Sequence, residues 1–454
     1  MGIARSREVG LADWIRRVYG QPNPLPEVTG CNARPAGRCS LCWAGRLPYA
    51  KEVRLRQKAL EQWLKELELP LSKFLSAGNG RSYRQVSKRR WLPQAKRLVM
   101  SEGREKGWSV GGCQLEPTGH ASVYQFLAAE LVRSPLRHHL NYVIVKGVEE
   151  LVVLFNLSSR RAERAEMNRL SRRLSEQCPQ VKGVWLVQGS KDDEYYLNIR
   201  PGDSERLFGA DHLSSHHLDY SPLGFSQVNA QAVPLLLDAT RQWLGDASIP
   251  LLDLFCGHGL FSLQLGRTGP CLGLDAASTS LDWARRNARK LHSSARFKRW
   301  DLLREPIPER FFPEQPWVAV VDPPRPGVSR EWVEHLAARG PQRVVHWVCD
   351  SSRLARQAQA WRKAGYRIAQ LIAVDMFAGT DAIEIGLMLE PSQEPRGGTP
   401  RRAKTRRPST KVGAAVPCKS PKKPANSQAS STGSGTRPNR AGRSTTRTRP
   451  RGKA

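Results

Sequence analysis

The sequence has no long apolar segment and no export signal. A membrane-spanning helix needs roughly 18 consecutive apolar residues, and no such run occurs among the 454 residues. The first residues mix Arg5, Arg7 and Glu8 with apolar ones, unlike the apolar core of a secretory signal. We therefore expect a cytoplasmic protein without membrane contact, and the sequence indicates no protein partner.

Acidic residues are scarce, since 41 Asp and Glu stand against 72 Lys and Arg, a formal net charge of +31. Such an excess favours a polyanionic partner, above all nucleic acid, because cations displace condensed counterions from phosphate backbones. A solvated basic surface, or a genome rich in Arg codons, would produce the same charge without a nucleic-acid partner. Composition alone therefore leaves the function open.

The chain is long enough for two or three domains, and its patterning predicts four segments. Residues 1–30 are predicted to be a leader, and residues 31–215 a small α/β domain for RNA recognition that contains a four-cysteine cluster. Residues 216–390 are predicted to form a larger α/β domain, followed by a disordered tail over 391–454. The tail has seventeen basic residues against the single acid Glu394, so it holds about half of the net charge and cannot bury a core.

The segment 31–215 combines a cysteine-rich turn with helix and strand patterns. Apolar residues at helical spacing predict an amphipathic helix over 53–69. A basic and aromatic stretch at 80–104 is either an RNA-contacting surface or an ordinary solvated strand or loop. A charged helix is expected at 160–177, beside an antiparallel sheet. The strands of this sheet are expected at 142–145, 151–155, 184–187 and 195–199.

The segment 216–390 alternates helix patterns with short apolar runs. This alternation is typical of βαβ units and predicts a doubly wound, Rossmann-like sheet whose strands are largely parallel. The strands are expected at 251–255, 271–274, 317–321 and 344–348.

The first two of these strands end in residues suited to binding a nucleotide-like ligand. The turn at 253–259 contains a pair of glycines, which let the backbone bend sharply against a ligand. Asp275 ends the next strand, where a carboxylate can accept hydrogen bonds from ribose hydroxyls, and Asp301 is placed to meet an adenine. A nicotinamide enzyme would share these features, but Ser262 occupies the position of the third glycine of its GxGxxG motif.

The last two strands end in polar or reactive side chains. In the segment 322–327, prolines stiffen the backbone while Asp322 and Arg325 project into the predicted cleft, although a rigid turn would have the same sequence. Cys349 follows the last strand, at the edge where substrates of such folds bind. A lone cysteine there is more often a small buried apolar residue.

Five motifs in this order resemble those of the RNA 5-methyluridine (uracil-C5) methyltransferase family. They cover the segment 216–390, and the cysteines extend the resemblance to the amino-terminal half. The motifs are Phe225-Ser-Gln227-Val-Asn229, Asp253-Leu-Phe-Cys-Gly257, Asp322-Pro-Pro-Arg-Pro-Gly327, Cys349 with Leu354-Ala-Arg356, and Asp375-Met-Phe377 with Thr380 and Glu384.

The resemblance implies a class I methyltransferase domain that uses S-adenosylmethionine, with a pair of catalytic residues. Cys349 matches the family nucleophile, whose thiolate adds to uracil C6 and makes C5 nucleophilic. Glu384 matches the general base that removes the C5 proton, so that the enzyme thiol can leave. Four residues are implied to contact S-adenosylmethionine: Gln227, Phe255, Asp275 and Asp322.

Several positions depart from the family pattern. Asp275 replaces the usual Glu and shortens the reach to the ribose by one methylene. Asp350 and Ser351 stand where Asn and Pro usually follow the nucleophile, and Ala378 and Ala382 stand where Pro and His are common. A carboxylate at Asp350 tends to raise the pKa of the neighbouring thiol and so to lower its reactivity.

Nine cysteines in a cytoplasmic chain indicate metal or thiol chemistry rather than a disulfide scaffold. Cys31, Cys39, Cys42 and Cys113 provide four thiolates, the ligand number of tetrahedral zinc or of an iron–sulfur cluster. The segment 31–42 resembles the cluster region of the 23S ribosomal RNA uracil-C5 methyltransferases that lack a TRAM domain. This resemblance implies a structural [4Fe-4S] cluster, with zinc as the alternative.

Together these features predict an enzyme that methylates C5 of a uridine in RNA through a covalent cysteine adduct at uracil C6. The cysteine arrangement favours 23S ribosomal RNA as the substrate, with transfer RNA as the close alternative. A third interpretation is an RNA-binding or assembly protein that keeps the cofactor fold but has weakened catalysis. The altered residues near Cys349 and the basic tail would fit that interpretation.

Overall fold

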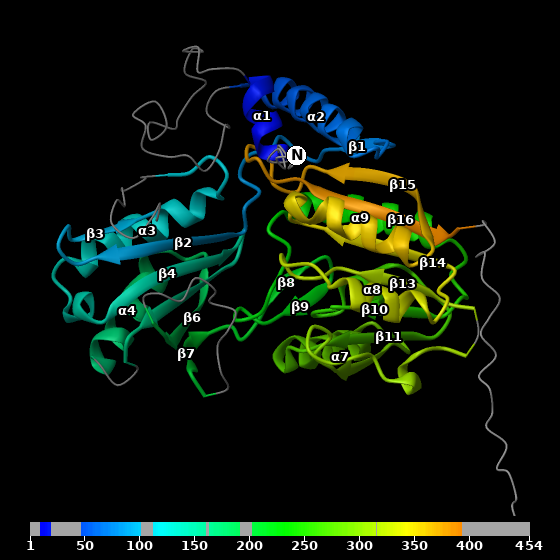
Figure 1. The fold of residues 1–454 in the computed structure, drawn as a ribbon. Coiled ribbons are helices and arrows are strands. Elements are labelled where there is room, and N and C mark those ends of the chain that lie inside the picture. The colour runs from blue at the N-terminus through cyan, green and yellow to red at the C-terminus, as the bar shows by residue number, and fades with distance from the viewer. Residues whose placement is uncertain are drawn as a thin grey trace, which may run out of the picture. The chain divides into compact units, whose positions relative to one another are not determined.

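The computed structural model describes residues 10–19, 47–100, 112–159, 163–190, 202–314 and 316–392. Their strands form an eight-stranded sheet, a six-stranded sheet and a two-stranded ribbon (Figure 1). The strand expected at 195–199 and the tail beyond residue 392 lie outside the described residues. No helix in the described ranges is both long and apolar enough to cross a lipid bilayer.

The eight-stranded sheet has the order β1-β15-β16-β14-β13-β10-β11-β12. All its neighbours pair in parallel except β16, which runs antiparallel to both β14 and β15. This arrangement confirms the predicted α/β fold with a largely parallel sheet. The strands are β1 (Lys73–Leu75), β10 (Leu251–Leu254), β11 (Cys271–Asp275), β12 (Arg296–Arg299), β13 (Val318–Val321), β14 (Arg343–Val348), β15 (Tyr366–Val374) and β16 (Glu384–Pro391).

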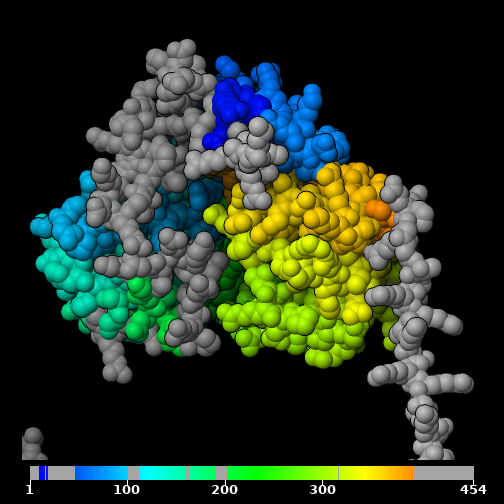
Figure 2. All heavy atoms as spheres, in the orientation of Figure 1, coloured from blue at the N-terminus to red at the C-terminus, as the bar shows by residue number. Residues whose placement is uncertain are grey.

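Helices cover both faces of this sheet, which is why its central strands read as continuous apolar runs. On one face, α1, α2, α8 and α9 share an apolar core with Ala319 and Val321. On the other face, α5 and α6 share a second core with Val318 and Val320. Figure 2 shows α1 and α2, in blue, resting against the yellow and orange surface of β15 and β16. These helices are α1 (Leu11–Tyr19), α2 (Tyr49–Glu66), α5 (Val233–Leu244), α6 (Leu260–Gln264), α7 (Ser278–Lys290), α8 (Arg330–Ala337) and α9 (Leu354–Lys363).

The six-stranded sheet has the order β3-β2-β4-β5-β6-β7. The prediction of an antiparallel sheet is wrong for one pair, because β5 and β6 are parallel. The helix α4 connects these two strands, and a crossover of this kind returns the chain in the same direction. The elements are β2 (Val86–Leu92), β3 (Arg97–Val99), α3 (Thr118–Leu131), β4 (Leu140–Gly147), β5 (Leu151–Leu157), α4 (Arg164–Gln177), β6 (Val181–Gln188) and β7 (Ser204–Gly209).

Several parts of the fold do not follow the predicted segment boundaries. The predicted leader contains α1, whose Leu11 and Ile15 are buried in the core beneath α2. The strand β1 comes from the segment 31–215 but pairs with β15 of the eight-stranded sheet. The boundary at 215–216 falls within the ribbon of β8 (Leu213–Ser215) and β9 (Leu218–Tyr220). The four-segment division therefore stays a prediction.

The basic stretch at 80–100 is only partly a surface. Arg89 and Trp91 on β2, and Tyr83 before it, are buried. The Arg89 guanidinium pairs with the Glu116 carboxylate at 2.6 Å. Alternate residues of β2 therefore face the core of the small domain, and only the other side chains remain for contact with a partner.

Candidate active site

The topology of the large sheet brings the two predicted catalytic residues to one edge. Cys349 directly follows β14, at the carboxyl end of a parallel strand. Glu384 begins β16, which runs the opposite way beside β14, and Val348 pairs with Ile385. One position beyond this pair, Cys349 therefore lies opposite Glu384. Two residues 35 positions apart therefore meet at the edge where the parallel strands end.

The Cys349 thiol is half-buried and lies among charged side chains. Burial raises its pKa most, and the Glu384 and Asp322 carboxylates raise it further. The Arg325 guanidinium lowers the pKa, and Asp350 raises it by the smallest contribution. In the absence of substrate the side chain is therefore a thiol, and a role as nucleophile would require it to lose a proton first.

Glu384 is a buried carboxyl group beside a second one. It is 4% exposed, and its Oε1 has no hydrogen-bond partner among the described residues. Burial, and then the Asp322 carboxylate, raise its pKa well above the ordinary value. Burial, and then the Asp253 carboxylate, raise the pKa of Asp322 to about 7. Gln227, one of the predicted cofactor residues, donates from Nε2 to Asp322 Oδ2 at 3.3 Å.

We expect Asp350→Asn to speed attack by Cys349 at neutral pH. Removing the negative charge lowers the pKa of the thiol, so the acid limb of the pH–rate profile moves to lower pH. Because Asp350 makes the smallest contribution, we expect a shift of less than about one pH unit. Asn keeps the local turn, since its oxygen can still accept the Ser352 amide that Asp350 Oδ1 accepts at 3.0 Å.

The measurement is the single-turnover rate of covalent adduct formation with RNA from neutral pH upward, because burial raises the pKa of the thiol above its ordinary value. Asp282→Asn, which neutralises an exposed carboxylate on α7, is the matched control. A profile that stays in place or moves to higher pH would show that Asp350 does not act on the thiol.

The turn after β10 is bent in a way that marks it as a binding loop. Phe255 has a φ of 67°, a left-handed conformation that non-glycine residues adopt at a cost of about 1–3 kcal/mol. Gly257 has a φ of 55°, and a side chain at that position would meet no atom within 4 Å. The Phe255 ring lies 6.0 Å from the ring of Trp332, on α8. The loop is therefore held from behind by an aromatic pair and open on the Gly257 side.

Two carboxylates hold this turn in place. Asp275, at the end of β11, accepts the Gly257 amide at 2.9 Å and the Ala277 amide at 2.8 Å. Asp253, on β10, is fully buried and accepts the Ser262 amide at 2.9 Å. Burial raises the pKa of Asp253 to about 6, and its Oδ1 has no hydrogen-bond partner among the described residues. The predicted site residues Gln227, Phe255, Asp275 and Asp322 thus lie at one edge of the sheet.

A group of buried charged residues next to this edge escaped the sequence analysis. The predicted apolar stripe of α2 included Val53 and Leu67, but these are only half-buried. The buried face instead contains Glu52 and Arg56, both 0% exposed, ahead of Ala59 and Leu60. Their spacing could have revealed them in the sequence. Glu52 and Arg56 are four residues apart, and on a helix they continue the buried stripe that Ala59 and Leu60 form.

Of the four predicted cluster ligands, only Cys113 lies within the described residues. Cys31, Cys39 and Cys42 belong to the range 20–46, which the structure does not describe. Cys113 is half-buried and packs against the apolar group formed by Tyr83, Leu115 and Ala378. Within the ranges that are described, no three His, Cys, Asp or Glu side chains form a group able to hold a metal ion.

Comparison with known proteins agrees with the resemblance in the motifs. No protein-family model matches the chain. The 23S rRNA (uracil(747)-C(5))-methyltransferase RlmC of Xenorhabdus nematophila is 24% identical over 378 residues, which are 78% of this chain and 97% of that protein. The 23S rRNA (uracil(1939)-C(5))-methyltransferase RlmD of Pseudomonas fluorescens is 28% identical over 411 residues, 86% of this chain and 82% of that protein. Over most of its length the chain is therefore similar to RNA uracil-C5 methyltransferases.

A solved structure of an RNA uracil-C5 methyltransferase has the same fold. The tRNA (uracil-54, C5)-methyltransferase of Pyrococcus abyssi, in complex with S-adenosyl-L-homocysteine, superposes with a TM-score of 0.60 at 19% identity. The match covers 76% of this chain and 84% of that one. The predicted Rossmann-like methyltransferase fold is thereby confirmed. The alignments with the homologous 23S rRNA uracil-C5 methyltransferases also extend over both sheets.

Proposed function

We propose that this protein transfers a methyl group from S-adenosylmethionine to C5 of a uridine in RNA, with 23S ribosomal RNA as the favoured substrate. The observation that carries the proposal is the meeting of Cys349 and Glu384 at the substrate edge of the sheet. Uracil C5 is a poor nucleophile, so this chemistry needs both a thiolate and a base beside one another. Similar proteins with this substrate class, matched over 78% and 86% of this chain, add to the support.

The two residues would act in sequence on one uracil ring. The Cys349 thiolate adds to C6, and the electron pair of the C5–C6 double bond moves to C5 and onto the O4 enolate. C5 then forms its new bond to the methyl group, whose old bond to the sulfonium sulfur breaks with its electron pair staying on sulfur. The Glu384 carboxylate takes the remaining C5 proton, the double bond re-forms, and the C6–S bond breaks to release the thiolate. A buried carboxylate with a raised pKa is a stronger base than an exposed one, which suits this carbon acid.

Bound S-adenosylmethionine would supply the electrophilic methyl group. The turn after β10 and the carboxylate of Asp275 suit its ribose, and the side chains of Phe255, Gln227 and Asp322 would contact the rest of the molecule. The open side of Gly257 and the unsatisfied Asp253 Oδ1 support a polar ligand at this turn. Asp275 already accepts two backbone amides, so its carboxylate would be held in one orientation when a ribose binds.

The four predicted thiolate ligands would hold a structural [4Fe-4S] cluster, with zinc as the alternative. Cys113 supports this role because it packs near Tyr83 and Ala378 rather than in the catalytic centre. Methyl transfer needs no redox step, so the cluster would brace the amino-terminal segment. Iron and acid-labile sulfide in protein purified without oxygen would support the cluster, and zinc alone would contradict it.

The substrate is tested with purified protein, labelled S-adenosylmethionine and RNA transcripts that carry no modifications. We expect 5-methyluridine in 23S ribosomal RNA, mapped to one uridine by mass spectrometry of nuclease fragments. If the label appears only in transfer RNA, transfer RNA is the substrate instead of 23S ribosomal RNA. RNA binding without label in either RNA would favour the assembly-protein interpretation, in which the raised pKa of Cys349 reflects weakened catalysis.

A further inference from the structure

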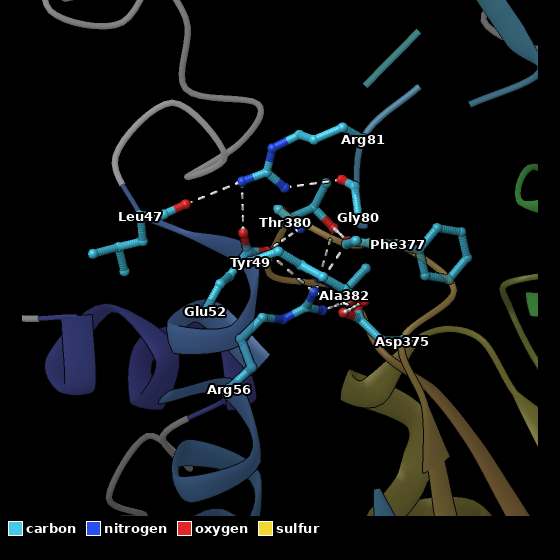
Figure 3. Close-up of polar contacts among 12 residues, drawn as sticks. Leu47, Tyr49, Glu52, Arg56, Gly80, Arg81, Asp375, Phe377, Thr380 and Ala382 are labelled. Carbon is cyan, nitrogen blue, oxygen red and sulfur yellow. Dashed lines mark hydrogen bonds and ion pairs between the residues drawn. The ribbon is translucent and has the colours of Figure 1, made fainter. Parts of the chain in front are cut away.

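The loop that leads into Glu384 is held by side chains from the amino-terminal part of the chain. Residues 375–383 connect β15 to β16 and end directly at Glu384. Asp375, at the start of the loop, is fully buried. Its Oδ2 accepts the Tyr49 hydroxyl at 2.9 Å, and its Oδ1 accepts Arg56 Nη1 at 2.5 Å (Figure 3).

Arg56 also donates hydrogen bonds to two backbone carbonyls of the loop. Its Nη1 donates to the carbonyl of Phe377 at 3.3 Å, and its Nη2 donates to the carbonyl of Ala382 at 2.5 Å. Ala382 is two residues from Glu384. One planar guanidinium on α2 thus reaches both the beginning and the end of the loop, as Figure 3 shows.

Further side chains hold the middle of the loop. The Glu52 carboxylate accepts the amide of Gly379, and the Tyr83 hydroxyl donates to the carbonyl of Ala378 at 2.8 Å. Within the loop, the Thr380 hydroxyl donates to the carbonyl of Phe377 at 2.8 Å. The backbone before Glu384 is therefore fixed along its length, which leaves little freedom for the carboxylate that follows.

The ionic character of this anchor is unusual for a joint between a helix and a loop. The side chains of Glu52, Arg56 and Asp375 are fully buried, and Arg81 adds a second cation 3.1 Å from Glu52. Burial raises the pKa of Glu52, and Arg56 and Arg81 lower it. Apolar residues of similar volume stabilise a buried joint at least as well as an ion network does, so the network's value is its directed geometry.

The Tyr49 ring packs tightly against the backbone of Gly80. Gly80 has a φ of 68°, and a side chain there would come within 2.3 Å of the Tyr49 ring. Only glycine therefore leaves room for the ring that brings the hydroxyl to Asp375.

We propose that Arg56 is a positioning residue for the general base: by joining Asp375 to the carbonyls of Phe377 and Ala382, it holds Glu384 at the C5 proton of the uracil. This inference rests on the proposed function. It assigns to α2, far from the catalytic motifs in sequence, a role in the late step of the reaction. Addition of Cys349 to C6 and methyl transfer precede proton removal, so they do not depend on this joint.

The test uses Arg56→Lys in the full-length protein. Lysine keeps the cation between Glu52 and Asp375, but a single ammonium cannot also reach the carbonyl of Ala382 in the geometry of the guanidinium. The control is Arg343→Lys at the opposite edge of the sheet, where Arg343 also contacts one carbonyl and one carboxylate. Each variant is mixed with S-adenosylmethionine and transcribed 23S ribosomal RNA, and the denaturation-stable protein–RNA adduct is followed in time.

For Arg56→Lys we expect adduct formation within about twofold of the unchanged protein and release of methylated RNA slowed by roughly ten- to hundredfold. The methylated adduct should then accumulate on denaturing gels, whereas Arg343→Lys should accumulate none. A merely structural clamp would slow formation and release in equal proportion, and that result, or release at the normal rate, would overturn the proposal.

Two further variants keep the test decisive. If Arg56→Lys does not fold, Tyr49→Phe removes one hydrogen bond to Asp375 and leaves the ion pairs, and its failure to accumulate any adduct counts against the proposal. Glu384→Gln is the reference for a missing base. Accumulation in Glu384→Gln but not in the α2 variants would refute only the role of Arg56, whereas no adduct in any variant would refute the proposed covalent function itself.

Discussion

Cys349→Ala is expected to lose at least about a thousandfold in methyl transfer, because the addition to C6 that activates uracil C5 would be lost. The other cysteines near the sheet cannot replace it. Cys256 and Cys271 are buried, and burial raises the pKa of both thiols further from the range where a thiolate forms. The measurement is the single-turnover transfer of labelled methyl groups to RNA.

A second readout separates loss of the nucleophile from loss of the fold. RNA containing 5-fluorouridine has no C5 proton to remove, so the unchanged protein should be trapped as a stable adduct. Cys349→Ala should form none and should bind S-adenosylmethionine with unchanged affinity. Cys271→Ala removes a buried thiol of the same sheet and should be trapped normally. An undiminished adduct in Cys349→Ala would show that another residue is the nucleophile.

Glu384→Gln is expected to slow turnover by about 10²- to 10⁴-fold, the usual contribution of a general base. The effect should fall on the second half of the reaction. Glutamine cannot carry the negative charge by which ionised Glu384 raises the pKa of Cys349, so thiolate formation should be no harder and adduct formation should stay at least as fast. The enzyme should therefore collect as a methylated adduct with ordinary uridine RNA.

The control for this variant lies on the same strand. Glu390→Gln makes the same substitution near the far end of β16, where Glu390 pairs with Arg343 at 3.3 Å, away from the catalytic edge. It should change stability slightly and turnover hardly at all. If Glu384→Gln slows adduct formation as much as turnover, Glu384 acts before methyl transfer, and the late base must be another group, with the neighbouring Asp322 first in line.

The sequence by itself determined the parts of this protein that depend on local pattern. Apolar runs alternating with helical periods predicted the parallel strands, because a strand covered on both faces must be apolar throughout. The end of each such strand then placed Asp275, Asp322 and Cys349 at one edge, because parallel strands share a direction. The basic strand β12 escaped this logic, since an exposed edge strand need not be apolar.

Only the tertiary structure decided what surrounds the reactive atoms. The antiparallel strand β16 brings Glu384 beside Cys349. The local sequence of a strand does not indicate which other strand it will pair with. The pKa of the thiol follows first from its burial and then from carboxylates on three different segments. Arg56 and Asp375 lie 319 positions apart, and a charged residue on a helix reads as solvent-exposed until its buried partner is known. Motif order could thus predict the chemistry, while the forces that hold and tune it depend on contacts between segments far apart in sequence.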